Sequence, residues 1–62
     1  MTQFKRTINK KANNITYYVD GKRVSEDKFG IKETVCRVAG MQYNSSYTTS
    51  DNSYIRHYHS YN

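Results

Sequence analysis

The dipeptide Asp20-Gly21 constrains the fold of this chain more than any other feature, because it stands between two runs rich in β-branched and aromatic residues. A two-residue type I′ turn needs positive φ at both central positions, and Asp-Gly is one of the preferred pairs. Such a turn pairs Val19 with Lys22, Tyr18 with Arg23 and Tyr17 with Val24. The sequence therefore predicts a hairpin over residues 15–24. Its core face is expected to hold Ile15, Tyr17, Val19 and Val24.

A further strand is predicted upstream of this hairpin. Asn13-Asn14 provides a second turn, and pairing outward from it sets Ala12 opposite Ile15 and Ile8 opposite Val19. Phe4 then shares the core face with Ile8. A one-residue slip at either turn would move both side chains to the other face, so the two turns support each other. We expect a three-stranded meander over residues 3–24.

The next segment carries signals of a helix of about residues 25–39. Ser25 is a hydroxyl cap followed by two acidic residues, and Gly40 is a typical helix stop. Apolar residues follow at helical spacing: Ile31, Val35, Val38 and Ala39. Because several residues here are β-branched, a strand over 33–39 remains the alternative.

The C-terminal part predicts a second, tyrosine-rich hairpin. The polar segment 50–53 interrupts an alternating pattern of aromatic residues. Pairing Thr49 with Tyr54 sets Tyr47 opposite Arg56. One face then holds Tyr43, Tyr47, Tyr54 and Tyr58, and the other holds Ile55, His57, His59 and Tyr61. We expect a tyrosine-bearing face to pack on the helix, which completes a small antiparallel α+β fold.

The composition limits the size of the core and therefore the stability of this fold. The chain has 62 residues, with seven Tyr but neither Leu nor Trp, so we expect one domain, 1–62, with a small tyrosine-rich core. No disulfide can reinforce it within one chain, since Cys36 is alone. Stability is therefore expected to draw on a partner or on a homodimer. The apolar runs are too short for a membrane span or secretory signal, which predicts a cytoplasmic protein.

The sequence gives little indication of a catalytic or metal-binding site. His57 and His59 have a spacing that metal sites use, but with Cys36 they supply only three ligands of the kind that structural zinc sites take in fours. Cys36 lies within an apolar stretch, which indicates a buried thiol rather than a nucleophile. We therefore expect no enzyme activity, no metal and no cofactor.

Basic residues gather on the face of the meander opposite its core. The predicted registers place Lys5, Thr7, Asn9 and Lys11 there, beside Thr16, Tyr18 and Arg23. A tyrosine among cations can stack a base while the cations hold phosphates, as single-strand-binding sheets do. This pattern predicts a nucleic-acid-binding surface, with Lys5, Lys11, Tyr18 and Arg23 in contact. Its alternative is a polar face that only meets water.

The C-terminal hairpin offers a different surface. Tyrosine and arginine are enriched at the centres of protein interfaces, where rigid aromatic rings bind at low entropic cost. Some of these rings are expected in the core in place of Leu. The candidate partner-binding residues are Tyr43, Tyr47, Tyr54, Arg56, His57, Tyr58, His59 and Tyr61.

Residues 17–29, Tyr-Tyr-Val-Asp-Gly-Lys-Arg-Val-Ser-Glu-Asp-Lys-Phe, resemble segments of small uncharacterised proteins of tailed bacteriophages. The resemblance implies a phage context, in which small accessory proteins include inhibitors of host defence such as anti-CRISPR proteins. Together with the composition, it leads to the hypothesis of a non-catalytic interaction protein that binds and inhibits or modulates a larger host macromolecule, such as a defence nucleoprotein complex. Sequence-tolerant binding of single-stranded nucleic acid is the alternative hypothesis.

Overall fold

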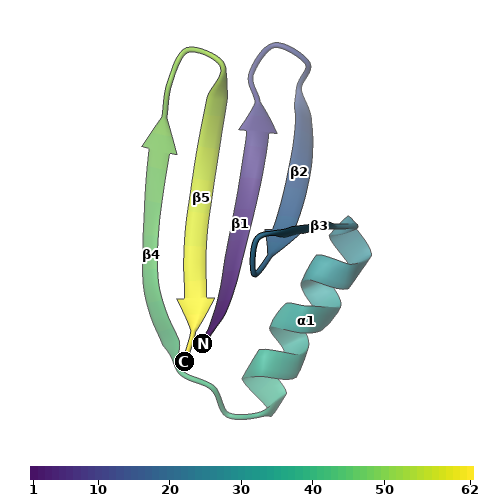
Figure 1. Cartoon of the computed structure of the whole chain (residues 1–62), viewed down its shortest axis with the longest axis vertical. Coiled ribbons are helices and arrows are strands. Elements are labelled where there is room, and N and C mark those ends of the chain that lie inside the picture. Colours follow the sequence, from purple (N-terminus) through teal and green to yellow (C-terminus); the bar gives the residue numbers. More distant parts are fainter.

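The computed structural model describes residues 1–62, apart from the side chain of Ser45. It contains five strands and one helix: β1 (Thr2–Asn9), β2 (Asn14–Val19), β3 (Lys22–Val24), α1 (Glu26–Val38), β4 (Tyr43–Ser50) and β5 (Tyr54–Tyr61). The strands form one antiparallel sheet in the order β3-β2-β1-β5-β4. The first and last strands are neighbours, so the two chain ends lie side by side (Figure 1). The predicted α+β class is confirmed.

The hairpin predicted around Asp20-Gly21 is confirmed in its register. Val19 pairs with Lys22, and Tyr17 pairs with Val24. Asp20 and Gly21 have φ of 51° and 82°, as a type I′ turn requires. The Asp20 carboxylate also accepts a hydrogen bond of 2.9 Å from the backbone N–H of Gln3, which ties the turn to β1.

The predicted two-residue turn at Asn13-Asn14 is wrong. Residues 10–13 form a longer turn, in which Oδ1 of Asn9 accepts hydrogen bonds from two backbone N–H groups and Asn13 has a φ of 55°. The register therefore pairs Ile8 with Ile15 and Phe4 with Val19, instead of Ala12 with Ile15 and Ile8 with Val19. The shift is by an even number of residues, so every strand residue keeps its predicted face. Lys11 lies in the turn and not on a strand face.

The helix is confirmed, and the alternative strand over 33–39 is excluded. Ser25 caps it by accepting a hydrogen bond from the backbone N–H of Lys28, and Gly40 follows its end with a φ of 76°. The apolar stripe found in the sequence does not face the core. Phe29 and Cys36 are buried, whereas Ile31, Val35 and Val38 are exposed. The side that faces the sheet also includes the half-buried Glu33, which a hydrophobicity pattern cannot detect because it is charged, and whose polar partners His59 and Tyr61 lie on the sheet.

The second hairpin forms with a register two residues from the predicted one. Thr49 pairs with Arg56, and Tyr47 pairs with Tyr58. The reason is the turn, in which the Asp51 carboxylate accepts hydrogen bonds from the backbone N–H groups of Ser53 and Tyr54. An irregularity between Tyr43 and Ser46 then inserts an extra residue, which places Tyr43 on the face opposite Tyr47.

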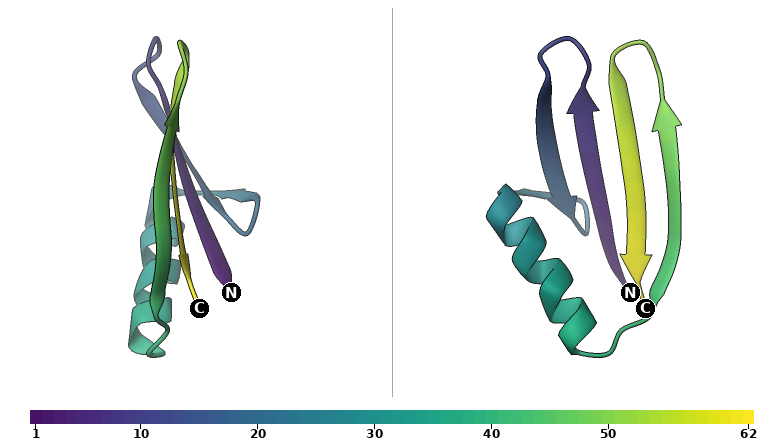
Figure 2. Two further views of the ribbon diagram at one scale, coloured as in Figure 1. Left: turned by 90° about the vertical axis from the view of Figure 1, so that its left-hand side faces the viewer. Right: turned by 180° about the vertical axis from the view of Figure 1, so that it is seen from behind.

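One side of the sheet carries the core. Five buried residues make it up: Phe4, Val19, Phe29, Cys36 and Tyr61. Phe4 lies at its centre, with its ring edge-on to Phe29 and Tyr61 and stacked on His59. The helix lies beside the lower half of the sheet, while the β1–β2 and β4–β5 turns extend beyond it (Figures 1 and 2). Within the described residues, no helix is long and apolar enough to cross a membrane.

Candidate nucleic-acid interface

The sheet face opposite the core is covered by no element of the chain that the structure describes, and we call it the open face. One row of paired residues crosses it through all five strands, and this row defines the candidate site. In order across the sheet it contains Arg23 (β3), Tyr18 (β2), Lys5 (β1), Tyr58 (β5) and Tyr47 (β4). Adjacent strands lie about 4.8 Å apart, so the row spans roughly 19 Å.

Contacts within the row order its side chains. The ammonium group of Lys5 lies 4.3 Å from the ring centroid of Tyr18. Tyr47 and Tyr58 stack with their centroids 4.6 Å apart and their planes inclined by only 14°. Tyr47 is 58% exposed, so the stack meets solvent at the edge strand β4. The row therefore alternates cations with preformed aromatic surfaces.

A shallow groove of about 490 Å³ adjoins this row. Lys5, Tyr18 and Arg23 line it from the N-terminal meander, and Tyr54 and Arg56 line it from β5; the remaining lining residues are Thr7, Asn9, Asn14 and Thr16. These uncharged side chains are hydrogen-bonding groups. The groove thus joins residues that sequence reasoning assigned to two separate sites.

Arg56 is held in place at the groove. Its Nη1 donates to Oδ2 of Asp51 at 3.0 Å, and its guanidinium lies 5.2 Å from the ring centroid of Tyr54. Hydrogen bonds from the backbone N–H groups of Tyr54 and Ser53, followed by that from Arg56, lower the pKa of Asp51 from 3.8 to about 2. The carboxylate is therefore ionised at neutral pH and orients the guanidinium.

Charge is segregated between the open face and the rest of the molecule. The five acidic residues lie in turns or in the helix: Asp20, Glu26, Asp27, Glu33 and Asp51. Among the described strand positions of the open face, no side chain is acidic, whereas Lys5, Arg23 and Arg56 are basic. Two further cations, Lys10 and Lys11, lie in the β1–β2 turn. The open face thus carries three of the ten basic side chains, and one of the three, Arg56, pairs with the Asp51 carboxylate.

Four of the predicted partner-binding residues lie on the side of the sheet that carries the core. Tyr61 is only 3% exposed and belongs to the core, as some of these tyrosines were expected to. His59 is stacked between Phe4 and Tyr43, which leaves it half-buried. His57 pairs through Nδ1 with the Thr48 hydroxyl at 3.0 Å. Tyr47, Tyr54, Arg56 and Tyr58 are the members of the predicted set that share the open face.

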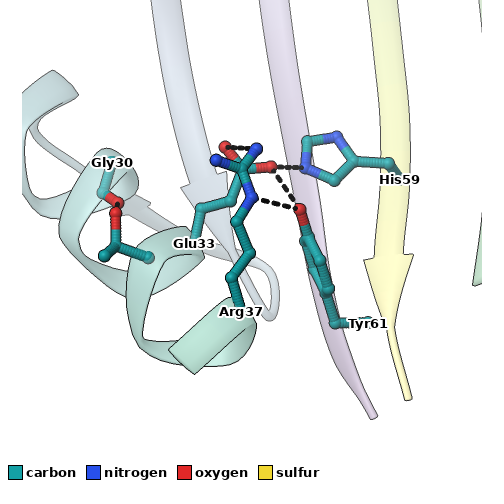
Figure 3. A network of polar contacts seen from close by, with 6 residues as sticks. Gly30, Glu33, Arg37, His59 and Tyr61 are labelled. Atoms are coloured by element: carbon teal, nitrogen blue, oxygen red, sulfur yellow. Dashed lines mark hydrogen bonds and ion pairs between the residues drawn. The ribbon is translucent and has the colours of Figure 1, made fainter. Parts of the chain in front are cut away.

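The half-buried polar groups on that side connect the helix to the sheet (Figure 3). Oε2 of Glu33 lies 2.6 Å from Nε2 of His59 and accepts a hydrogen bond from the Tyr61 hydroxyl at 3.1 Å. Nε of Arg37 donates to the Tyr61 hydroxyl at 3.2 Å, and this hydrogen bond raises the pKa of Arg37 above its ordinary value. The network satisfies its own members and holds the helix.

In the described part of the chain, no side chains are assembled into a metal-binding or nucleophilic site. No group of three or more His, Cys, Asp or Glu side chains is placed to hold a metal ion there. His57 and His59 share a face but bond to Thr48 and Glu33 respectively. Cys36 is buried in the core.

The sequence predicts residues of the open face as members of two separate sites, and it does not predict that these residues form one surface. The signal that joins them is the pairing of β1 with β5, whose residues stand at opposite ends of the chain. No pattern of neighbouring residues predicts that these two strands pair. Comparison of the chain with protein-family models, with curated proteins and with solved structures found no match.

Proposed function

We propose that the open face binds single-stranded nucleic acid with little regard to sequence. The observation that carries this proposal is the row Arg23-Tyr18-Lys5-Tyr58-Tyr47, which interleaves cations and aromatic rings across the whole sheet. Proteins that bind single strands combine a basic groove for the backbone with aromatic side chains on which bases stack. Every base has a stacking surface, so such binding tolerates different sequences.

The roles of the residues follow from their chemistry. Tyr18 and the Tyr47–Tyr58 pair present rings to bases, and Lys5 and Arg23 neutralise phosphates. Arg56 is paired with Asp51, so it contributes hydrogen-bond donors at the groove rather than a free positive charge. Lys10 and Lys11 extend the basic surface at the β1–β2 turn. No step of this function requires a reacting group or a metal.

Fluorescence anisotropy with labelled oligonucleotides of several sequences tests the proposal. If three phosphates are neutralised, the logarithm of the binding constant should fall with the logarithm of salt concentration with a slope of about −2, at roughly 0.7 per phosphate. Tyr58→Ala and Tyr18→Ala should each cost about 1–3 kcal/mol for every sequence. The corresponding Phe variants keep the rings and should bind almost as the parent does.

A charge control separates a defined site from general attraction. Arg23→Glu on the open face should weaken binding strongly, whereas Lys28→Glu, the same charge change on the helix, should weaken it little. Equal effects of the two variants, or no binding at about 50 mM salt, would reject the proposal.

The stacked Tyr47–Tyr58 pair at the sheet edge favours a second candidate, docking on a protein or nucleoprotein partner. Exposed tyrosine pairs are typical of protein interface centres. This candidate corresponds to the hypothesis of an interaction protein that inhibits or modulates a larger host complex. It is supported if Tyr47→Ala and Tyr58→Ala abolish recovery of a stoichiometric protein partner while oligonucleotides do not bind.

A further inference from the structure

The side of the sheet that carries the core has an apolar surface that the helix leaves uncovered. Ile15, Ile8 and Ile55 are direct cross-strand neighbours on β2, β1 and β5. They lie toward the strand ends that extend beyond the helix (Figure 1). Ile15 is exposed, and the other two are half-buried. This isoleucine row therefore lacks a covering layer within the described chain.

The helix has a second uncovered apolar surface on the same side of the molecule. Ile31 and Val35 are 62% and 57% exposed, because the opposite side of α1 supplies the core residues. They line an open groove of about 650 Å³ between the helix and the sheet, together with Arg6 and Tyr17 of the sheet. Glu26 and Asp27, in the first turn of the helix, line it as well.

We propose that a second copy of this chain packs on this side of the molecule about a two-fold axis, so that Ile31 and Val35 of each copy cover the isoleucine row of the other. A two-fold interface must be complementary to itself. Here one molecule carries both complementary parts, an uncovered apolar row and an apolar helix side. The helix lies beside the lower half of the sheet, whereas the strand ends that hold the isoleucine row extend beyond it, so two copies related by a two-fold axis can exchange these parts (Figure 2).

Charge and size support this occupant. Arg6 lies on the sheet wall of the groove, while Glu26 and Asp27 lie on the helix wall, so two opposed copies can meet with opposite charges. The molecule measures 37 × 22 × 14 Å, and contact through its broad face can approach the roughly 800 Å² per partner that standard interfaces bury. Such contact also adds to the apolar surface that a core of five residues buries.

The dimer goes beyond the proposed function and does not depend on it. Both open faces point outward from such a dimer, so Tyr58→Ala should leave the dimer intact. Sedimentation equilibrium without nucleic acid therefore tests the dimer separately. The expected mass is twice 7.3 kDa at tens of micromolar chain. A monomer at about 100 μM would overturn the proposal.

Surface variants locate the interface. Ile31→Glu with Val35→Glu should give a monomer with an unchanged circular dichroism spectrum, because both side chains are exposed in the single chain. The matched control is Val38→Glu, since Val38 is 83% exposed on the same helix but does not line the groove. It should remain dimeric. A dimer that survives the double substitution, or that the control dissociates equally, would overturn the proposal.

A charge exchange tests contact between copies directly. Arg6→Glu alone, and Glu26→Lys with Asp27→Lys alone, should each weaken the dimer by about tenfold or more, since like charges then oppose each other. Mixing the two variant chains should restore affinity, because every intermolecular contact again joins opposite charges. Within each variant chain the charges stay alike, so an intramolecular role predicts no recovery. Absence of recovery in the mixture would overturn the proposed pairing.

Discussion

Glu33 of the helix and His59 of β5 meet across the boundary between helix and sheet, with Oε2 of the carboxylate 2.6 Å from Nε2 of the imidazole (Figure 3). Their side chains are 20% and 18% exposed. The same carboxylate oxygen accepts the hydroxyl of Tyr61, so one acidic side chain satisfies two groups of β5. This contact ties the helix to the core side of the sheet, beside its lower half (Figure 1).

Glu33→Ala should therefore destabilise the protein by about 1–3 kcal/mol, because it leaves the half-buried His59 imidazole without its partner and the Tyr61 hydroxyl without the acceptor of its proton. Glu33→Gln should cost less, since its amide oxygen still accepts a hydrogen bond. Urea unfolding followed by circular dichroism measures both. Lys32→Ala is the control, as it removes an exposed charged side chain of the same helix that does not line the groove of the proposed dimer, and it should cost less than about 1 kcal/mol. Equal losses for Glu33→Ala and Lys32→Ala would contradict the role of the network.

Phe4→Ala should leave the chain largely unfolded at 25 °C. Phe4 is 1% exposed and contacts the rings of Phe29, His59 and Tyr61. A buried Phe→Ala change costs about 3–5 kcal/mol, which is comparable to the whole stability that a core of this size supplies. Phe4→Leu should remain folded with a lower melting temperature. Met1→Ala, at an exposed position beside β1, should change little; cooperative unfolding of Phe4→Ala at the parent temperature would contradict this account.

Asp20→Ala should cost about 1–3 kcal/mol, because alanine disfavours a φ of 51° and cannot accept the hydrogen bond from Gln3. Asp20→Asn keeps an oxygen acceptor and tolerates positive φ, so it should remain close to the parent. Thermal unfolding of the two variants gives the comparison. If the Asn variant is as unstable as the Ala variant, the turn geometry is not the reason for the loss.

Asp51 should make stability depend on pH in the acid range. Its pKa in the folded protein, about 2, lies below the ordinary 3.8, so the unfolded chain binds this proton first as pH falls. The stabilising contribution of Asp51 is therefore complete above about pH 4 and is lost as pH falls through about 2. Carboxyl chemical shifts measured by NMR give the pKa, and Asp51→Asn should remove this part of the pH dependence. A carboxyl that titrates at its ordinary pKa would contradict the turn geometry.

Structural features that depend only on neighbouring residues could be predicted from the sequence. The turn at Asp20-Gly21 and the cap at Ser25 follow from the backbone preferences of a few consecutive residues, and both are confirmed. The faces of Phe4, Ile8, Lys5 and Tyr18 were also predicted correctly although the β1–β2 register was not. Side chains alternate with a period of two, so an even error in register leaves the faces unchanged.

The register of each hairpin depends on the length of its turn, and the local sequence does not determine that length. The asparagines of the β1–β2 turn suit a turn of two residues as well as the observed one, which Asn9 closes with its own side chain. Similarly, the predicted turn spans residues 50–53, whereas β4 continues to Ser50 and the Asp51 carboxylate closes a shorter turn, which sets Tyr47 opposite Tyr58. In both hairpins the local sequence suits more than one turn conformation, and the pairing of the full strands determines which one forms.

The sequence by itself determined the elements, the period of each strand and the cap of the helix, because these depend on residues close together in the chain. The tertiary structure alone decided that Phe29 and Cys36, and not Ile31 and Val35, face the core. It also placed β5 beside β1 and thereby assembled the row across the open face. These outcomes depend on which distant surfaces bury the most area and satisfy Glu33, and that balance exists only once the whole chain is packed.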